Sequence, residues 1–220
     1  MEIYTNKNDH EIAKFIANSI STELNKDKKV LWFASGGSSI SIASLVSLIL
    51  HSENQNLQNL TVTLTDERYG EIGHADSNWQ QLQNAGFILP KAKLIPILSG
   101  KSIEETTLDF KNNLITAFKD TDYSIGLFGA GIDMHTAGIL PETLATTSLD
   151  LTTHYHTEIF NRITITLRTI RALNEAILYL KGKNKLPVLE RLKEKNKTLR
   201  EPVQALKEIK KLAVFFDSGV

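Results

Sequence analysis

An aspartate and a histidine follow a glycine-rich turn in the stretch IGLFGAGIDMHTAGILP, which covers residues 125–141. Histidine is the usual general base near neutral pH, and a nearby carboxylate can fix its tautomer. Asp133 and His135 therefore form a candidate acid–imidazole pair, whose simplest chemistry is activation of a water molecule by His135. The chain contains no G-x-S-x-G stretch, so a serine triad is not indicated.

The same turn could instead hold the pyrophosphate of a dinucleotide in a G-x-G-x-x-G loop. Gly129 and Gly131 match the first two glycines, but Met134 occupies the third position. Pro141 comes too soon for the long helix that should follow, and no acidic residue ends a second strand about 20 residues further on. We therefore predict that the chain uses no organic cofactor here.

Two other histidines, His154 and His156, share one face of an extended segment and could ligate zinc. A catalytic zinc site needs three protein ligands, and the sequence offers no convincing third partner. We therefore predict no metal site.

A candidate anion site is Ser35-Gly36-Gly37-Ser38, which lies between an apolar run and the beginning of a predicted helix. Glycine lets the backbone approach a ligand closely, and the first amides of a helix favour phosphate. The serine hydroxyls add donors. The lysine of a P-loop is missing, so a nucleoside triphosphate is not expected. A plain turn with Ser38 or Ser39 as helix cap is the alternative.

A third polar cluster, Asp66-Glu67-Arg68, follows another apolar run. Arg68 could hold an anion or stabilise a developing oxyanion, and Asp66 could orient a partner or act as a base. The alternative is an ion pair on the surface, which contributes little to stability.

Apolar runs of strand length alternate with helical patterns along the chain. Strands are predicted at residues 30–34, 60–65, 93–98, 123–128, 162–167, 176–180 and 212–216, and helices at 40–50, 77–85, 102–119 and 186–194. This alternation predicts an α/β fold with a doubly wound, mainly parallel, Rossmann-like sheet and helices on both faces. Ligands bind beyond the carboxyl ends of such strands, so we expect the three polar clusters to meet in one crevice.

The composition fits one α/β domain over residues 1–220, because 41% of the residues are hydrophobic. Lys and Arg together number 25, as do Asp and Glu, so no nucleic-acid partner is expected. No apolar run approaches the roughly 18 residues of a membrane span, and the first residues do not resemble a secretory signal. We therefore expect a cytoplasmic protein without a membrane partner. Cysteine is absent, and the sequence carries no signal for the oligomeric state.

Taken together, these stretches resemble the 6-phosphogluconolactonases, relatives of glucosamine-6-phosphate deaminase/isomerase. Family members carry a serine–glycine–glycine–serine loop, an Asp-Glu-Arg with a later Ser-Asn pair, a Gly-x-Gly-x-Asp-Gly-His-Thr-Ala loop ending at proline, an Arg opening an alternating strand, and a Gly-x-x-Lys. The matching residues are Ser35 to Ser38, Asp66 to Arg68, Ser77-Asn78, Gly129, Gly131, Asp133, His135 to Ala137, Pro141, Arg162, and Gly182 with Lys185. The resemblance covers nearly the whole chain, in the right order.

The resemblance implies hydrolysis of 6-phosphoglucono-1,5-lactone to 6-phosphogluconate, the second step of the pentose phosphate pathway. The partner would be a small-molecule sugar phosphate lactone, and no metal or organic cofactor would be needed. The phosphate would be held by the amides of the serine–glycine loop together with Arg162 and Lys185.

The resemblance also implies catalytic roles. His135, oriented by Asp133 or Asp66, would deprotonate the attacking water. Arg68 would stabilise the tetrahedral oxyanion.

Three features separate the lactonases from the deaminases of the same family. The deaminases resemble Asp-Glu-Tyr where this chain has Arg68, and Ser-Tyr where it has Asn78. They also place a functional Glu just before the proline of the signature loop, where this chain has Leu140; Glu142 follows Pro141. All three features favour a lactonase, and a deaminase/isomerase-type enzyme is the alternative.

The chain departs from the family pattern in and near its loops. Met134 replaces the glycine between Asp and His, residues 39–40 read Ser-Ile in place of Thr-Pro, and residues 138–140 read Gly-Ile-Leu in place of Ser-Leu-Phe. If the family glycine has a positive φ, Met134 is strained there or the local backbone differs. A catalytically inactive sugar-phosphate-binding homologue is therefore a second alternative.

Overall fold

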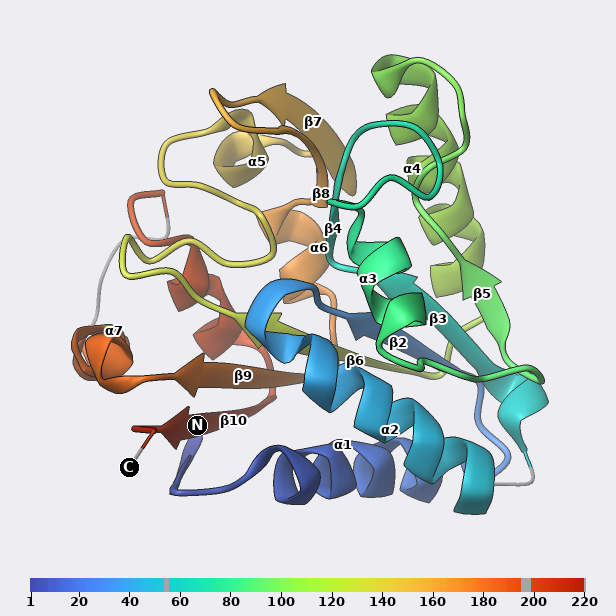
Figure 1. Ribbon diagram of the computed structural model, residues 1–220, viewed down its shortest axis with the longest axis vertical. Coiled ribbons are helices and arrows are strands. Elements are labelled where there is room, and N and C mark those ends of the chain that lie inside the picture. Colours follow the sequence, from blue (N-terminus) through green and yellow to red (C-terminus); the bar gives the residue numbers. More distant parts are fainter. Residues whose placement is uncertain (54–55, 195–198, 220) are drawn as a thin grey trace.

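A parallel sheet forms the centre of the fold. The computed structural model describes residues 1–53, 56–194 and 199–219. Within these residues the sheet has seven strands, all paired in parallel, which confirms the predicted doubly wound architecture (Figure 1). In spatial order the strands are β1 (Glu2–Thr5), β10 (Lys211–Asp217), β9 (Glu175–Lys181), β6 (Tyr123–Gly129), β2 (Val30–Ala34), β3 (Leu60–Leu64) and β5 (Lys93–Ile95).

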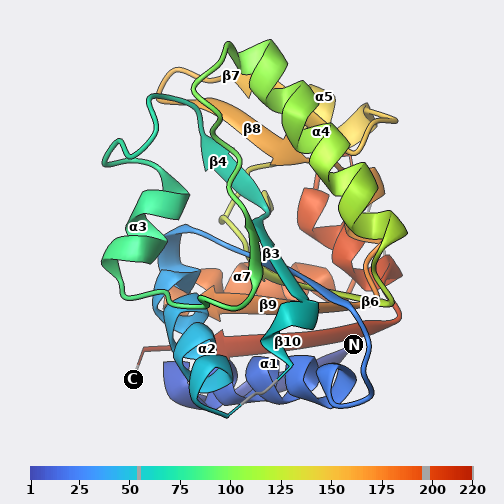
Figure 2. The same cartoon turned by 90° about the vertical axis from the view of Figure 1, so that its right-hand side faces the viewer.

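A second, antiparallel sheet of three strands lies above one face of the parallel sheet, as the two views agree (Figures 1 and 2). Its order is β4 (Asp66–Arg68), β8 (Asn161–Ile165) and β7 (Thr152–His156). The strand predicted at residues 162–167 is therefore present as β8, but it belongs to this small sheet. Its RITI pattern alternates, as is typical of antiparallel strands, whereas β2 and the middle of β9 in the parallel sheet are continuous apolar runs. The pattern alone does not separate the two sheets, because β3 (LTVTL) alternates as well.

Helices cover both faces of the parallel sheet. The helices α1 (Asp9–Leu24) and α2 (Ile40–Glu53) pack against each other on the face opposite the small sheet (Figure 2). The remaining helical elements are α3 (Asn78–Asn84), α4 (Ile103–Lys119), α5 (Leu144–Thr147), α6 (Leu167–Arg171), α7 (Leu186–Leu192) and the 3₁₀ turns η1 (Gly37–Ser39), η2 (Leu57–Asn59), η3 (Lys183–Lys185) and η4 (Pro202–Glu208). No helix of the described residues is long and apolar enough to cross a membrane.

Capping side chains determine where the two longest helices begin. The predicted capping box at the start of α4 is confirmed: Ser102 accepts from the amide of Glu105, whose carboxylate accepts from the amide of Ser102. An equivalent box, Asn8 with Glu11, begins α1. Neither α1 nor β1 was among the predicted elements, although the apolar residues of α1 recur at helical spacing.

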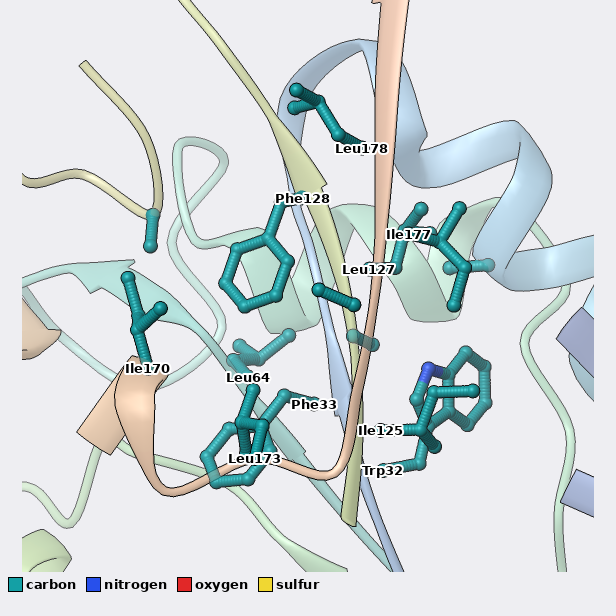
Figure 3. Close-up of a cluster of buried hydrophobic side chains, with 14 of the residues drawn as sticks. Trp32, Phe33, Leu64, Ile125, Leu127, Phe128, Ile170, Leu173, Ile177 and Leu178 are labelled. Atoms are coloured by element: carbon teal, nitrogen blue, oxygen red, sulfur yellow. The ribbon is translucent and has the colours of Figure 1, made fainter. Parts of the chain in front are cut away.

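The core consists of side chains that alternate between the two faces of the central strands. Figure 3 shows Trp32, Ile125 and Ile177 on one side of the strands, and Phe33 and Phe128 on the other. All five are fully buried. Burial of each such side chain contributes about 1.5–3 kcal/mol to stability.

The strand order determines where a ligand can bind. The chain runs outward from β2 through β3 to β5 and then returns to β6 on the other side of β2. The carboxyl ends of β2 and β6 therefore lie side by side at a topological switch point, where ligands bind in open α/β sheets. The serine–glycine loop follows β2, and the loop with Asp133 and His135 follows β6.

Candidate active site

The three polar clusters meet in one cavity of about 220 Å³ at this edge of the sheet. Its lining includes every predicted site residue except Asp133, namely Ser35, Gly36, Gly37, Ser38, Asp66, Arg68, His135, Arg162 and Lys185. Asn78, Gly129, Ala130, Gly131, Ala137 and Gly138 complete it. The expectation of a single crevice is therefore confirmed.

Asp133 does not line the cavity but contacts His135, which does. Its Oδ1 lies 2.7 Å from His135 Nδ1 and also accepts from the backbone amide of His135 at 3.3 Å. With Nδ1 directed at the carboxylate, Nε2 is the ring nitrogen available for proton transfer in the cavity. Asp66 does not contact the imidazole: its carboxylate faces Thr65 and Arg162. Of the two acids left open by the sequence, Asp133 has the geometry of the orienting group.

The absence of a side chain at Gly131 allows the pair to form. A Cβ atom there would lie 2.2 Å from Asp133 Oδ1 and 2.2 Å from His135 Nδ1, far inside van der Waals contact. The turn is closed by two backbone hydrogen bonds, from the Gly131 amide to the His135 carbonyl and from the Met134 amide to the Gly131 carbonyl, each 3.0 Å long. Gly131 is thus required by a close approach, since its φ is not positive.

Met134 adopts the backbone conformation that favours glycine. Its φ is 69°, which costs a non-glycine residue about 1–2 kcal/mol. Its side chain is nevertheless buried in the core, and its carbonyl accepts from the Val203 amide in η4 at 3.1 Å. Burial of a methionine side chain contributes about 1.5–3 kcal/mol, which offsets the strain. The Asp133–His135 pair forms beside it, so a methionine at this position is compatible with the pair.

The small antiparallel sheet holds the continuation of this loop. Thr164 of β8 donates its hydroxyl to the Ala137 carbonyl at 2.5 Å, and the Tyr155 hydroxyl of β7 donates to the Gly138 carbonyl. Burial raises the pKa of Tyr155, which keeps its hydroxyl protonated as a donor. Gly138 itself has a φ of 66° and packs directly on Asp66, which leaves no space for a Cβ atom. The signature loop is therefore fastened to a separate layer of the protein.

The serine–glycine loop presents its polar groups to the cavity. The turn η1 is preceded by Gly36 in extended conformation, and no serine side chain caps it. For the helix α2 that follows, Ser39 is not the cap, because its buried Oγ has no hydrogen-bond partner among the described residues. A Cβ atom on Gly36 would lie 2.0 Å from Asn78 Oδ1, so a glycine is needed where α3 packs on the loop.

Glu67 is the residue of the Asp-Glu-Arg cluster that joins β4 to α3. Its carboxylate is fully buried and accepts from the backbone amides of Arg68 (2.8 Å), Asn78 (2.6 Å) and Trp79 (3.0 Å) and from the Ser77 hydroxyl (2.9 Å). Burial raises the pKa of Glu67, and these hydrogen bonds act in the opposite direction. The carboxylate thus accepts from the first two amides of α3, and the Ser77 hydroxyl accepts from the third, that of Gln80.

Asn78 lines the cavity, although the sequence predicted no role for it in the site. It is 1% exposed, and its Nδ2 donates to the Asp66 carbonyl at 2.9 Å. The signal for it was the Ser-Asn pair at the start of a predicted helix. The Ser-Asn pair does not indicate which end of the sheet the helix faces.

Three cationic side chains also line the cavity. Arg68 and Arg162 are direct partners across β4 and β8. Arg162 Nη1 lies 3.5 Å from Asp66 Oδ2, and Arg68 Nη1 donates to the Asp76 carbonyl at 2.8 Å. Lys185 reaches the cavity from η3, after a turn at Gly182 whose φ is 97°. The arrangement suits a ligand that carries an anionic group.

The two histidines of β7 have other partners. His154 Nδ1 lies 3.1 Å from the Thr107 hydroxyl, and His156 Nδ1 lies 2.7 Å from Asn161 Oδ1. Within the described residues no three acidic, histidine or cysteine side chains are grouped so that they could hold a metal ion.

The substitution Glu67→Gln is expected to lower the free energy of unfolding by about 2 kcal/mol, because an amide cannot accept from all four donors. Denaturant titration measures this. Glu71→Gln, at an exposed position nearby, is the matched control and is expected to have no effect. Equal stability of the two variants would contradict the role given to Glu67.

The substitution Gly131→Ala is expected to separate Asp133 from His135, because the added methyl overlaps both side chains. Nitrogen NMR of the imidazole reports which ring nitrogen carries the proton, and the variant is expected to lose the Nδ1–H preference of the wild type. Gly129→Ala is the control, because a Cβ atom there meets its nearest neighbour at 3.8 Å. An unchanged tautomer in Gly131→Ala would refute the steric argument.

Variants of Met134 separate backbone strain from side-chain burial. Met134→Ala loses the buried side chain and keeps the strain, whereas Met134→Gly loses both. We expect both to be less stable than the wild type, with the glycine variant more stable than the alanine variant by about 1 kcal/mol. Thermal unfolding of the three proteins gives the order. An alanine variant as stable as the glycine variant would show that the site is unstrained.

Comparison with known proteins identifies the family of this chain. The family model described as "Glucosamine-6-phosphate isomerases/6-phosphogluconolactonase" matches residues 6–214. A 6-phosphogluconolactonase of Helicobacter pylori is 28% identical over 192 residues, which cover 83% of this chain and 81% of the relative.

Solved structures share the fold. A 6-phosphogluconolactonase from Shewanella baltica superposes with a TM-score of 0.83 at 21% identity, over 99% of this chain and 98% of the other. A monomeric glucosamine-6-phosphate deaminase superposes with a TM-score of 0.79 at 20% identity, over 99% and 97%. Two activities therefore occur on this fold, and only the residues of the cavity can separate them. The chain belongs to the glucosamine-6-phosphate isomerase/6-phosphogluconolactonase family.

Proposed function

We propose that this chain hydrolyses 6-phosphoglucono-1,5-lactone to 6-phosphogluconate, the second step of the pentose phosphate pathway, in the cytoplasm as expected from the sequence. The observation that carries the proposal is the 2.7 Å contact of Asp133 with His135 Nδ1, in a cavity that is also lined by Arg68, Arg162 and Lys185. The cavity combines a candidate general base with a group of cations, as hydrolysis of a phosphorylated lactone requires. The curated relative from Helicobacter pylori, named a 6-phosphogluconolactonase, supports it.

Residues around the cavity favour the lactonase over the deaminase branch. The position before Pro141, where deaminases carry a functional Glu, is Leu140, which supplies no acid or base. Arg68 lines the cavity where a tyrosine is expected in a deaminase, and Asn78 replaces the second tyrosine. A guanidinium can stabilise the oxyanion of an acyl transfer, whereas a tyrosine offers one neutral donor.

The phosphate is proposed to lie against the serine–glycine loop. Its uncapped turn offers backbone amides and the hydroxyls of Ser35 and Ser38, and it leads into the N-terminus of α2. Arg162 and Lys185 add charge from two other elements. These contacts are equal in the ground and transition states, so they act chiefly on substrate affinity.

The chemical step is proposed to use water as nucleophile. His135 Nε2 accepts a proton from the water as the water oxygen bonds to the lactone carbonyl carbon. Arg68 stabilises the oxyanion that forms. The bond from that carbon to the ring oxygen then breaks, and the imidazolium returns its proton to the ring oxygen. The product carboxylic acid releases a proton to solvent.

Asp133 and Asp66 are proposed to divide two tasks. Asp133 fixes the His135 tautomer and stabilises the imidazolium. Asp66 instead holds the Arg162 guanidinium, from which it is separated by 3.5 Å, and carries Asn78 on its carbonyl. This division follows from the contacts of each carboxylate.

Kinetics of two variants test the roles. His135→Ala is expected to lower kcat by about a hundred- to ten-thousand-fold, because proton transfer from water is lost. Lys185→Ala is expected to raise KM about tenfold with a smaller change in kcat, because it removes a charge-assisted contact. The assay couples product to 6-phosphogluconate dehydrogenase and subtracts spontaneous hydrolysis. His10→Ala, at an exposed position, is the control. The reverse split between kcat and KM would overturn the assignment.

The same assay decides between the activities. Ammonia released from glucosamine 6-phosphate, without lactone turnover, would identify a deaminase. Binding of 6-phosphogluconate without turnover would identify a non-enzymatic sugar-phosphate binder.

A further inference from the structure

We propose that Phe160 is a positioning residue for Arg68 and Arg162, whose guanidiniums it holds together so that both can meet one anionic substrate. The identity of that substrate rests on the proposed function, whereas the positioning itself does not. The ring lies 5.3 Å from the Arg68 guanidinium carbon and 5.7 Å from that of Arg162. One aromatic side chain therefore makes two cation–π contacts at the wall of the cavity.

The two arginines need such a partner because of their register. They occupy directly opposed positions on β4 and β8, where like charges destabilise a strand pair. Both side chains are guanidiniums of the same charge, so their approach needs a partner that offsets the repulsion. Asp66 faces Arg162 at 3.5 Å, but the contact of Arg68 is to the uncharged carbonyl of Asp76. Of the two guanidiniums, only that of Arg162 has a carboxylate contact among the described residues.

The hydrogen bonds of each guanidinium are arranged in the same way. The Nη1 atoms have the protein acceptors just described, and the Nε atoms are buried without a hydrogen-bond partner among the described residues. A buried N–H group without an acceptor destabilises a fold, and the face of an aromatic ring is the weak acceptor within reach. Phe160 packs against both guanidiniums, and no hydrogen bond among the described residues occupies their Nη2 groups, which are therefore available for an anion.

A tight turn places the ring. Phe160 directly precedes β8, in the connection from β7. The Thr157 hydroxyl accepts from the Phe160 amide at 3.0 Å, and the Thr157 amide donates to the Phe160 carbonyl at 3.0 Å. The backbone of Phe160 is thus held on both sides. The same strands carry Thr164 and Tyr155, which fasten the loop of the catalytic pair.

Calorimetric binding of 6-phosphogluconate and of inorganic phosphate tests the proposal. Phe160→Leu keeps an apolar side chain but removes the ring, and we expect it to raise Kd for both ligands about tenfold and to lower kcat/KM by a similar factor. Phe160→Tyr keeps the ring face, so its Kd and kcat/KM are expected to match those of the wild type. Ile159→Ala, at a 79% exposed position in the same turn, is the control and is expected to match the wild type.

The outcomes separate positioning from simple packing. A Phe160→Leu protein with a lower Tm but unchanged Kd would overturn the proposal, as would a Phe160→Tyr protein that binds as weakly as the leucine variant. A wild type that binds neither ligand would overturn it too. If the wild type binds phosphate but turns over no lactone, the proposed function fails, and the phosphate affinities of the variants still decide the role of Phe160.

Discussion

Parallel pairing of β2 with β6 determines where the chemistry of this chain can lie. Because the two strands are adjacent and point the same way, the loops that follow them must meet at one edge. One loop supplies amides and hydroxyls, and the other supplies the acid–imidazole pair. The connections from β2 and from β6 lead to opposite sides of the sheet, which leaves room for a ligand between these loops.

The small sheet and α3 convert that edge into a rigid site. Thr164 and Tyr155 hold the carbonyls that follow the histidine, while the buried carboxylate of Glu67 ties β4 to the first turn of α3. These contacts join residues that lie 11, 17 and 27 positions apart in the sequence. The site therefore depends on the packing of three layers, and its precision comes from hydrogen bonds to backbone atoms that any residue type would present.

Much of this could be predicted from the sequence, because the central strands are apolar runs and the polar clusters follow them directly. The crevice and its three polar clusters were accessible in this way, whereas Arg162 and Lys185 followed only from the family resemblance and Asn78 was not assigned to the site. The strand state of β4 was not, since Asp-Glu-Arg has no strand pattern and becomes a strand only by pairing with β8. The roles of Glu67 and Phe160 were hidden for the same reason. A buried carboxylate and a shared aromatic ring are defined by their neighbours in space.

Met134 has a consequence for how members of this family are recognised. The turn before His135 contains one residue in the left-handed backbone conformation, and in this chain that residue is a buried methionine. A motif written in residue letters would reject the chain at that position, whereas a motif written in backbone dihedral angles would accept it. A search for relatives with other buried side chains at this position should therefore compare the backbone conformation of the turn.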